Sequence, residues 1–191
     1  RIAARLLYLV YFPDAFRADP LGTAFANGGL VWYGGVAGAL LGAAWMARAK
    51  RLDARRTLDL FMPPVALGLA FGRMGCLLAG CCYSAACQLP WAIRYPAGHP
   101  THPAWVHPAP VYESLGALTI AGILVALERF AKPTPGAVTA LFFVLYGILR
   151  FGLEYLRGDK LLVGDALSAS QWFSLVGIAV GVGYLAWLAR R

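Results

Sequence analysis

Long runs of apolar residues, separated by short polar connections, dominate the chain. A helix that crosses a membrane needs about 20 predominantly apolar residues, so the runs are interpreted as membrane spans. They cover residues 28–47, 58–78, 112–127, 137–156 and 171–188, and residues 2–12 are part of another span. The pattern predicts an all-α fold, a polytopic transmembrane helical bundle of six to seven helices that forms a single integral membrane domain over residues 1–191. Because the chain starts at Arg1 rather than Met, we expect the first helix to be incomplete, with residues missing before Arg1.

The composition agrees with this pattern. Hydrophobic residues make up 60% of the chain and charged residues 14%, and the mean hydropathy is +0.62. Average soluble domains contain about 45–50% apolar residues with glycine included and about 25% charged residues. The composition therefore excludes an ordinary water-soluble domain, a disordered region, a collagen-like fibre and a small disulfide-stapled protein.

The excess positive charge predicts the orientation. The chain has 17 Lys and Arg against 9 Asp and Glu, a formal net charge of +8. The basic residues gather at the ends of the predicted spans: Arg48, Lys50, Arg51, Arg55 and Arg56, then Arg129 and Lys132, then Arg190 and Arg191. The positive-inside rule places these ends, and the C-terminus, in the cytoplasm. No basic groove with interleaved aromatic residues accompanies the charge, so nucleic acid is not an expected partner.

One long connection, residues 84–107, then lies outside the cytoplasm. It contains His99, His102 and His107 and is rich in proline, and a loop of this length in a compact bundle is usually functional. The three histidines could ligate a metal ion or could simply be solvated. His107 is favoured for proton transfer or for contact with a head group, because it adjoins Tyr112 and Glu113.

Four ionisable residues inside the spans carry the functional hypothesis, because charges in a membrane are costly and usually functional. Arg73, Glu113, Arg150 and Glu154 are all expected near the outer leaflet. Arginine is a permanently charged planar fork suited to phosphate, so the sequence predicts a site for a phospholipid head group. Alternatives remain open: Arg150 and Glu154 could only neutralise each other, and Glu113 could be a charge that interacts with the dipole of its helix.

A polar stripe is expected on the fourth of these spans. Tyr146, Arg150, Glu154 and Arg157 are spaced by four, four and three residues, which predicts that they lie along one helix face. Arg157 could alternatively extend its charge to the membrane interface.

All four cysteines fall within a short segment. Cys76, Cys81, Cys82 and Cys87 lie at the outer end of the span that contains Arg73 and at the start of the histidine loop. Three interpretations remain open: one or two structural disulfides, a reactive or acyl-accepting thiol beside the site, and a metal site with the loop histidines.

Four motifs resemble those of the prolipoprotein diacylglyceryl transferase family, in the same order along the chain. Residues 28–35 read GGLVWYGG and resemble the glycine-rich element of the family; residues 72–75 read GRMG and resemble the start of its signature. Residues 107–113 read HPAPVYE and residues 146–154 read YGILRFGLE, and both are similar to later motifs of the family.

The resemblance implies a fold and an activity. Members move the diacylglyceryl group of phosphatidylglycerol to a cysteine thiol of a lipobox-containing preprotein in the bacterial inner membrane, and they need no metal or cofactor. By resemblance, the catalytic residues are Tyr33, Arg73, His107, Tyr146, Arg150 and Glu154. The residues expected to bind phospholipid, in addition to Arg73 and Arg150, are Gly34, Gly35, Tyr112, Glu113 and Arg157.

The chain also departs from the family's pattern. The family's signature continues with two asparagines and a glutamate, whereas Cys76, Ala79 and Cys81 lie in the corresponding segment here. Tyr33 replaces a histidine of the glycine-rich element, and this phenol either lines the substrate or only packs between helices. We therefore expect the donor side to be retained and the groups that activate the acceptor to be altered.

Two other functions remain open from the sequence. The chain could be a membrane thiol oxidoreductase that works through its cysteines, or a non-catalytic phospholipid-binding subunit.

Overall fold

The computed structural model describes residues 41–42, 45–82, 84–158, 162–163 and 167–190. Backbone contacts divide the chain into two units, residues 1–54 and 55–191, which are considered separately. In the first unit, residues 41–42 and 45–49 are helical and residues 50–51 form a turn. The predicted span at residues 2–12 and most of the one at residues 28–47 lie outside the described residues.

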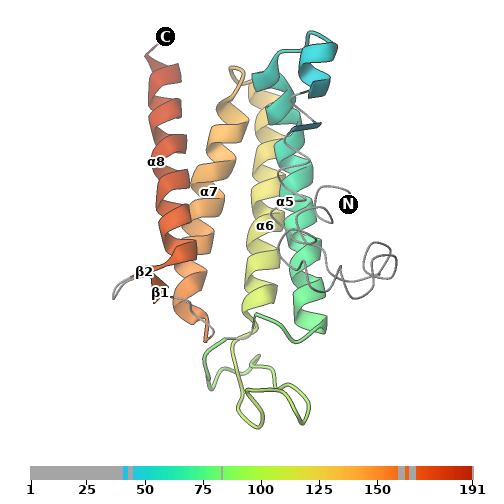
Figure 1. Ribbon diagram of the computed structural model, residues 1–191, viewed down its shortest axis with the longest axis vertical. Helices are drawn as coiled ribbons and strands as arrows, with labels where there is room; N and C mark the ends of the chain where they lie inside the picture. The colour runs from blue at the N-terminus through green and yellow to red at the C-terminus, as the bar shows by residue number, and fades with distance from the viewer. Residues whose placement is uncertain (1–40, 43–44, 83, 159–161, 164–166, 191) are drawn as a thin grey trace, which may run out of the picture. The chain divides into compact units, whose positions relative to one another are not determined.

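Four helices dominate the second unit. They are α5 (Ala54–Leu78), α6 (Ala109–Ala126), α7 (Ala137–Leu153) and α8 (Ala169–Ala189), shown in Figure 1. A π-helical turn, Leu127–Ala131, continues α6, and a 3-10 turn, Glu154–Leu156, continues α7. Each of the four is long and apolar enough to cross a membrane. The all-α membrane fold is confirmed, and the last four predicted spans match these helices to within a few residues.

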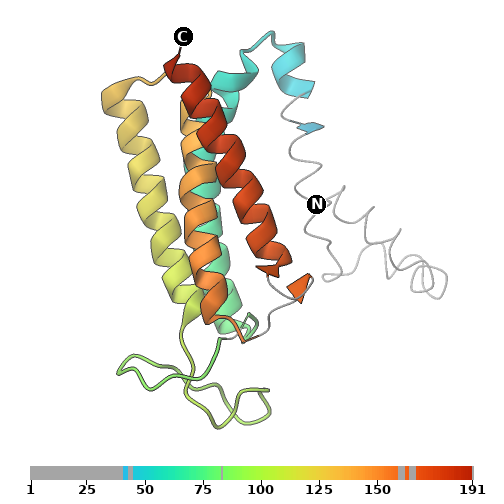
Figure 2. The ribbon, with the colours of Figure 1, turned by 90° about the vertical axis from the view of Figure 1, so that its left-hand side faces the viewer.

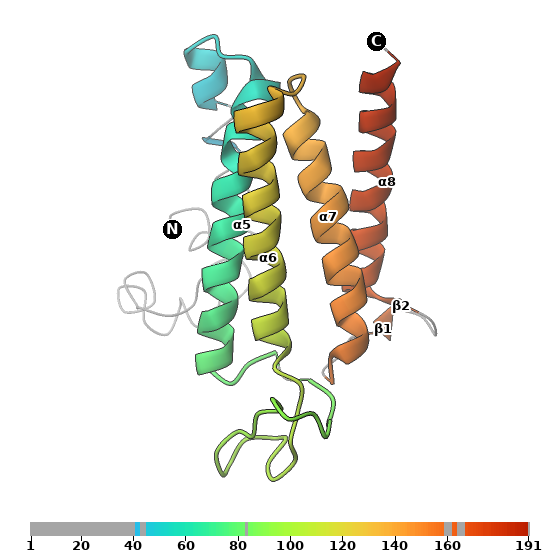
Figure 3. The same ribbon diagram turned by 180° about the vertical axis from the view of Figure 1, so that it is seen from behind.

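Successive helices run in opposite directions. Figures 1 and 3 show the connection from α5 to α6, residues 79–108, at one end of the four helices, which we call the loop end. A short antiparallel hairpin of β1 (Leu162–Val163) and β2 (Leu167–Ser168) lies at the same end. The opposite end carries the connection from α6 to α7 and the end of α8, as Figure 2 also shows, and we call it the basic end because Arg56, Arg129, Lys132 and Arg190 lie there.

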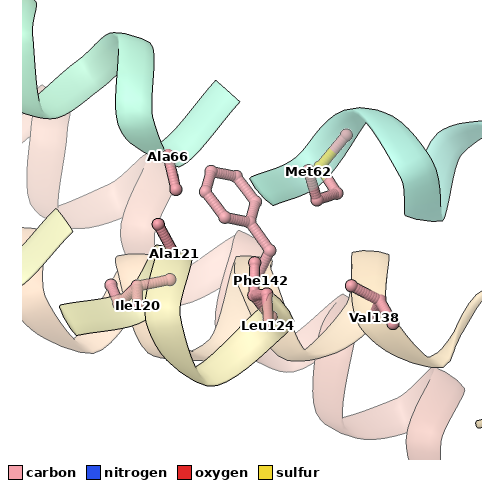
Figure 4. Close-up of a cluster of buried hydrophobic side chains, with 7 residues drawn as sticks. All are labelled: Met62, Ala66, Ile120, Ala121, Leu124, Val138 and Phe142. Carbon is pink, nitrogen blue, oxygen red and sulfur yellow. The ribbon is translucent and has the colours of Figure 1, made fainter. Parts of the chain in front are cut away.

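The core of this unit is small and apolar. Figure 4 shows its buried members, which come from α5, α6 and α7: Met62, Ala66, Ile120, Ala121, Leu124, Val138 and Phe142. Many large apolar side chains are instead exposed, including Leu78 at 86%, Phe173 at 73% and Phe71 at 72%. Such a surface is unfavourable in water and is typical of helices surrounded by lipid.

A buried carboxylate fixes the basic end of the core. Asp59 of α5 is only 4% exposed. Its Oδ2 accepts a hydrogen bond from the backbone N–H of Gly136 at 2.6 Å, and its Oδ1 accepts from the backbone N–H and the hydroxyl of Thr139 at 2.8 and 2.7 Å. These bonds satisfy backbone donors at the N-terminus of α7 from another helix, in the manner of an N-cap.

Small residues allow α7 and α8 to pack closely. A Cβ placed on Gly181 of α8 would lie 2.7 Å from the carbonyl oxygen of Ala140 and 2.7 Å from Val144 Cγ2. Membrane helices associate through such close backbone approaches, because lipid provides little hydrophobic driving force. The N-terminus of α8 is fixed by a capping box, in which Ser168 Oγ and the Gln171 side chain each accept from the other's backbone N–H.

The close approach at Gly181 gives a testable prediction. Gly181→Ala should lower the free energy of unfolding by about 1–3 kcal/mol, the usual cost of overpacking, and should lower the thermal unfolding midpoint in detergent. Gly183→Ala is the matched control, since a Cβ there would meet nothing within 4 Å. Equal midpoints for the two variants would contradict this packing of α7 against α8.

Candidate active site

A buried glutamate from α6 connects three helices near the loop end. Glu113 is 4% exposed. Its Oε1 lies 3.0 Å from Arg73 Nε of α5 and accepts a hydrogen bond from the Tyr146 hydroxyl of α7 at 2.8 Å. Its Oε2 lies 3.9 Å from Arg150 Nη1 of α7. Glu113 is therefore the shared counter-ion of two arginines, and not merely a charge at the start of a helix.

Arg150 has a second set of partners. Its Nη2 forms an ion pair with Glu154 Oε2 at 3.0 Å, although the geometry is not that of a hydrogen bond. The same Nη2 donates a hydrogen bond to Ser170 Oγ, in the first turn of α8, at 3.0 Å. Arg150 Nη1 is buried and has no hydrogen-bond partner among the described residues. An unsatisfied buried guanidinium N–H is energetically costly, so this atom is available to an incoming anion.

The cavity at this network is very small. It measures about 10 Å³ and is lined by Arg73, Glu113, Arg150 and Arg157, together with Cys82, Ala109, Pro110 and Leu153. This is roughly the space that one water molecule requires. A phosphate group can therefore enter only if these side chains move.

A larger hollow, of about 370 Å³, lies at the basic end. It is lined by Arg56, Asp59, Leu60, Val125, Glu128, Arg129, Lys132, Pro133 and Val138. Its three basic residues are exposed, and its buried Asp59 is already occupied by the N-terminus of α7. The small cavity is the better candidate for the active site. Its charged side chains lie inside the helix bundle, where burying a charge is costly and usually indicates a function.

The structure brings together five residues that the sequence selected: Arg73, Glu113, Tyr146, Arg150 and Glu154. The predicted helical stripe is wrong at Arg157. The α-helix ends at Leu153, and Arg157 has an extended backbone with φ −77° and ψ 137°. The chain leaves the helix there because Arg157 pairs with Ser84 in an antiparallel bridge, although Arg157 still lines the small cavity.

The three loop histidines do not converge on a common point. His99 Nε2 is 2.7 Å from the carbonyl oxygen of Gly80, and His102 Nδ1 is 3.1 Å from that of Tyr95. His107 instead lies edge-on to Tyr112, with ring centroids 6.2 Å apart. A metal site formed by these histidines together is therefore not supported.

His107 lies close to Tyr112 and Glu113 along the chain, and its ring contacts that of Tyr112. Its Nδ1 is buried and has no hydrogen-bond partner among the described atoms. The Tyr112 hydroxyl accepts a hydrogen bond from Trp91 Nε1 at 2.6 Å. Sequence reasoning missed Trp91 and Ser170, since neither a loop tryptophan nor a serine near a helix start signals a contact with the site. Tyr33, Gly34 and Gly35 lie outside the described residues.

The cysteines lie beside this network, and all four thiols are free. The Sγ atoms of Cys76, Cys81 and Cys82 lie within 4.8 Å of one another. Arg73 Nη1 is 3.8 Å from Cys82 Sγ. Partial burial, followed by the neighbouring sulfur atoms of Cys76 and Cys82, raises the pKa of the Cys81 thiol to about 11.

Comparison with known proteins decides the family. The family model described as prolipoprotein diacylglyceryl transferase matches residues 1–187. The chain belongs to this family. It is similar to the phosphatidylglycerol–prolipoprotein diacylglyceryl transferase of Finegoldia magna, with 37% identity over 183 residues that cover 95% of this chain and 71% of that protein.

Two further relatives with the same name agree. The protein from Clostridium tetani is 33% identical over 183 residues, covering 95% of this chain and 73% of its own length. The protein from Gloeobacter violaceus is 36% identical over 199 residues, which cover 98% of this chain and 72% of that protein. The predicted family and the prediction of a membrane transferase are confirmed. These relatives give no support to the thiol oxidoreductase or to the non-catalytic subunit.

The position of Glu113 gives a prediction about stability. Glu113→Gln should lower the thermal unfolding midpoint in detergent, because it leaves two buried guanidinium groups without their shared charge; breaking a buried pair costs about 3–5 kcal/mol. Glu128→Gln, at the basic end, is the control and should leave the midpoint unchanged. A Glu113→Gln protein as stable as the control would show that the three-helix ion pair contributes nothing to folding.

Proposed function

We propose that this chain transfers the diacylglyceryl group of phosphatidylglycerol to the cysteine thiol of a prolipoprotein. The names of the relatives supply the reaction. The observation that carries the proposal is the convergence of Arg73 and Arg150, from two helices, on one buried carboxylate inside the membrane-spanning part of the chain.

Phosphate binding follows from the charges of this network. The carboxylates of Glu113 and Glu154 balance the formal charges of Arg73 and Arg150. Arg157 adds a further positive charge to the lining of the cavity. A phosphodiester brings one negative charge and several acceptor oxygens, which a planar arginine fork binds in pairs. Arg150 Nη1, which is 3.9 Å from Glu113 Oε2 and has no hydrogen-bond partner among the described residues, offers the first contact. As the phosphate enters, the arginines exchange part of their contact with Glu113 for contact with the lipid.

The chemical step is a substitution at a glyceryl carbon. The thiolate sulfur of the prolipoprotein forms a bond to this carbon, while the bond from the carbon to a phosphate oxygen breaks. The electron pair stays on that oxygen, and glycerol phosphate leaves. Arg73 and Arg150 stabilise the charge that develops on the phosphate, and a preorganised donor of this kind contributes about 10²–10³-fold to a rate.

The thiol must lose its proton before or during the attack. His107 is the residue we propose for this role, because its Nδ1 is buried and has no hydrogen-bond partner among the described atoms. Tyr146, which donates to Glu113, is a positioning residue: its hydroxyl holds the carboxylate that orients both arginines.

The same features support a location and an orientation. We propose that the basic end faces the cytoplasm of a bacterial cell and that the site lies toward the outer leaflet of the inner membrane. The basic residues at the ends of the helices support this orientation by the positive-inside rule. The phospholipid and the prolipoprotein then meet at the loop end.

Conservative substitutions test the role of the arginine forks. Arg73→Lys and Arg150→Lys keep the charge but lose the planar pair of donors, so each should lower the transfer rate about 10²-fold. The measurement is thioether formation on a lipobox peptide, followed by mass spectrometry with labelled phosphatidylglycerol. Arg129→Lys, at the basic end, should retain full activity. Near-normal transfer by both site variants would remove the arginines from the mechanism.

A further inference from the structure

Three of the four cysteines form a cluster that the transfer reaction does not use. Cys76 is in the last turn of α5, and Cys81 and Cys82 follow that helix directly. We propose that Cys76, Cys81 and Cys82 bind a thiophilic divalent metal ion of the Zn²⁺ type at the loop end of α5. This metal site does not depend on the proposed reaction.

The distances between the sulfur atoms fit such an ion. All three Sγ atoms lie within 4.8 Å of one another. Zinc binds thiolate sulfur at about 2.3 Å with tetrahedral geometry, which places the sulfur atoms about 3.8 Å apart. A contraction of at most about 1 Å, within the reach of side-chain rotation, therefore closes three coordination positions. Solvent completes the fourth position.

The backbone is folded to bring the thiols together. After Leu78 the chain turns back, because the N–H of Gly80 donates to the carbonyl of Leu77 at 3.2 Å and the N–H of Cys81 to that of Cys76 at 3.1 Å. Gly80 has φ +68° and Cys82 has φ +59°. A positive φ is ordinary for glycine but uncommon and unfavourable for cysteine. The turn thus places two adjacent cysteines, whose side chains would diverge in an extended chain, on the same side as Cys76.

The local charges also suit a metal with three thiolates. Binding replaces three S–H bonds by three metal–sulfur bonds and releases three protons to solvent, with no change in oxidation state. The resulting centre has a net charge of −1. Arg73 Nη1, 3.8 Å from Cys82 Sγ, supplies the opposite charge.

A disulfide accounts less well for this arrangement. It would join only two of the three sulfur atoms and leave the third without a function. The convergence of all three thiols is what a metal site needs. Cys87 is not part of this group of close sulfur atoms. Its backbone N–H donates to the carbonyl oxygen of Trp105, further along the loop.

Cobalt is a suitable spectroscopic probe for the site. The chain is purified in detergent with a reductant, and a chelator removes any bound metal. The protein is then titrated with Co²⁺, and Co²⁺ bound by thiolates gives a strong thiolate-to-cobalt absorption band. We expect one ion per chain, displaced by one equivalent of Zn²⁺. Cys76→Ser, Cys81→Ser and Cys82→Ser should each weaken binding by at least about 100-fold, because each removes a direct ligand. Cys87→Ser is the matched control and should bind like the unaltered chain.

Thiol counting on the unaltered chain tests the site without a substitution that could disturb folding. In the reduced, metal-free protein unfolded in denaturant, alkylation should modify four cysteines. Native protein loaded with Zn²⁺ should be modified at only one, Cys87, and chelation should restore the alkylation of the others. Absence of the cobalt band, an equal loss of binding in Cys87→Ser, or an alkylation pattern unaffected by Zn²⁺ would each overturn the proposal.

A second consequence rests on the proposed function. The metal centre adds a negative charge beside Arg73, so Zn²⁺ should raise the KM for phosphatidylglycerol, and Cys82→Ser should abolish this effect. If the cobalt band appears without any transfer activity, the metal site stands and the proposed function fails. If transfer occurs and the cobalt band is absent, the proposed function stands and the metal site fails.

Discussion

The cost of burying charge in a membrane determines how this site is assembled. A guanidinium or carboxylate inside the bilayer needs a partner of opposite charge, since no water is available to solvate it. Glu113 meets this need for Arg73 and Arg150 together, and its contact with Tyr146 adds a neutral donor. Because Arg73 is on α5, Glu113 on α6 and Arg150 on α7, one carboxylate fixes the relative positions of three helices. The apolar core, which lies closer to the basic end, contributes packing, but packing alone would not set the register of these helices.

The site that we propose for the lipid phosphate has no large cavity. The charges of Arg73 and Arg150 are balanced at rest by Glu113 and Glu154, and the cavity beside them has room for about one water molecule. A phosphate that enters must take over arginine contacts from Glu113. The larger hollow at the basic end has more room, but its basic side chains are exposed and lack this arrangement of paired charges. Site chemistry, rather than cavity size, is therefore the reason we propose that the lipid phosphate binds between Arg73 and Arg150.

The sequence was sufficient for the helices and for most of the residues that meet at Glu113. Hydropathy alone places α7 and α8 to within a few residues, because a membrane span needs only length and apolar side chains. The depth of each in-span charge follows from its position along the span. The contacts between side chains of different helices could not be predicted in the same way, because they depend on which helices become neighbours. Two examples are the contact of Ser170 with Arg150 and the contact of Asp59 with the start of α7. Arg157 departs from the expected helix face because α7 ends at Leu153, and nothing in the residue spacing indicates that end. The cysteine cluster depends on the positive φ of Cys82, which no residue pattern indicates.

In the proposed function, Arg73 and Arg150 jointly hold the lipid phosphate in place of part of their contact with Glu113. The decisive measurement is a structure determined in a lipid nanodisc that contains phosphatidylglycerol. We expect a phosphate whose oxygens lie about 2.7–2.9 Å from both guanidinium groups, with Glu113 still bound to Tyr146. A phosphate that occupies only the hollow at the basic end, with the three-helix ion pair undisturbed, would show that the two arginines do not bind the lipid.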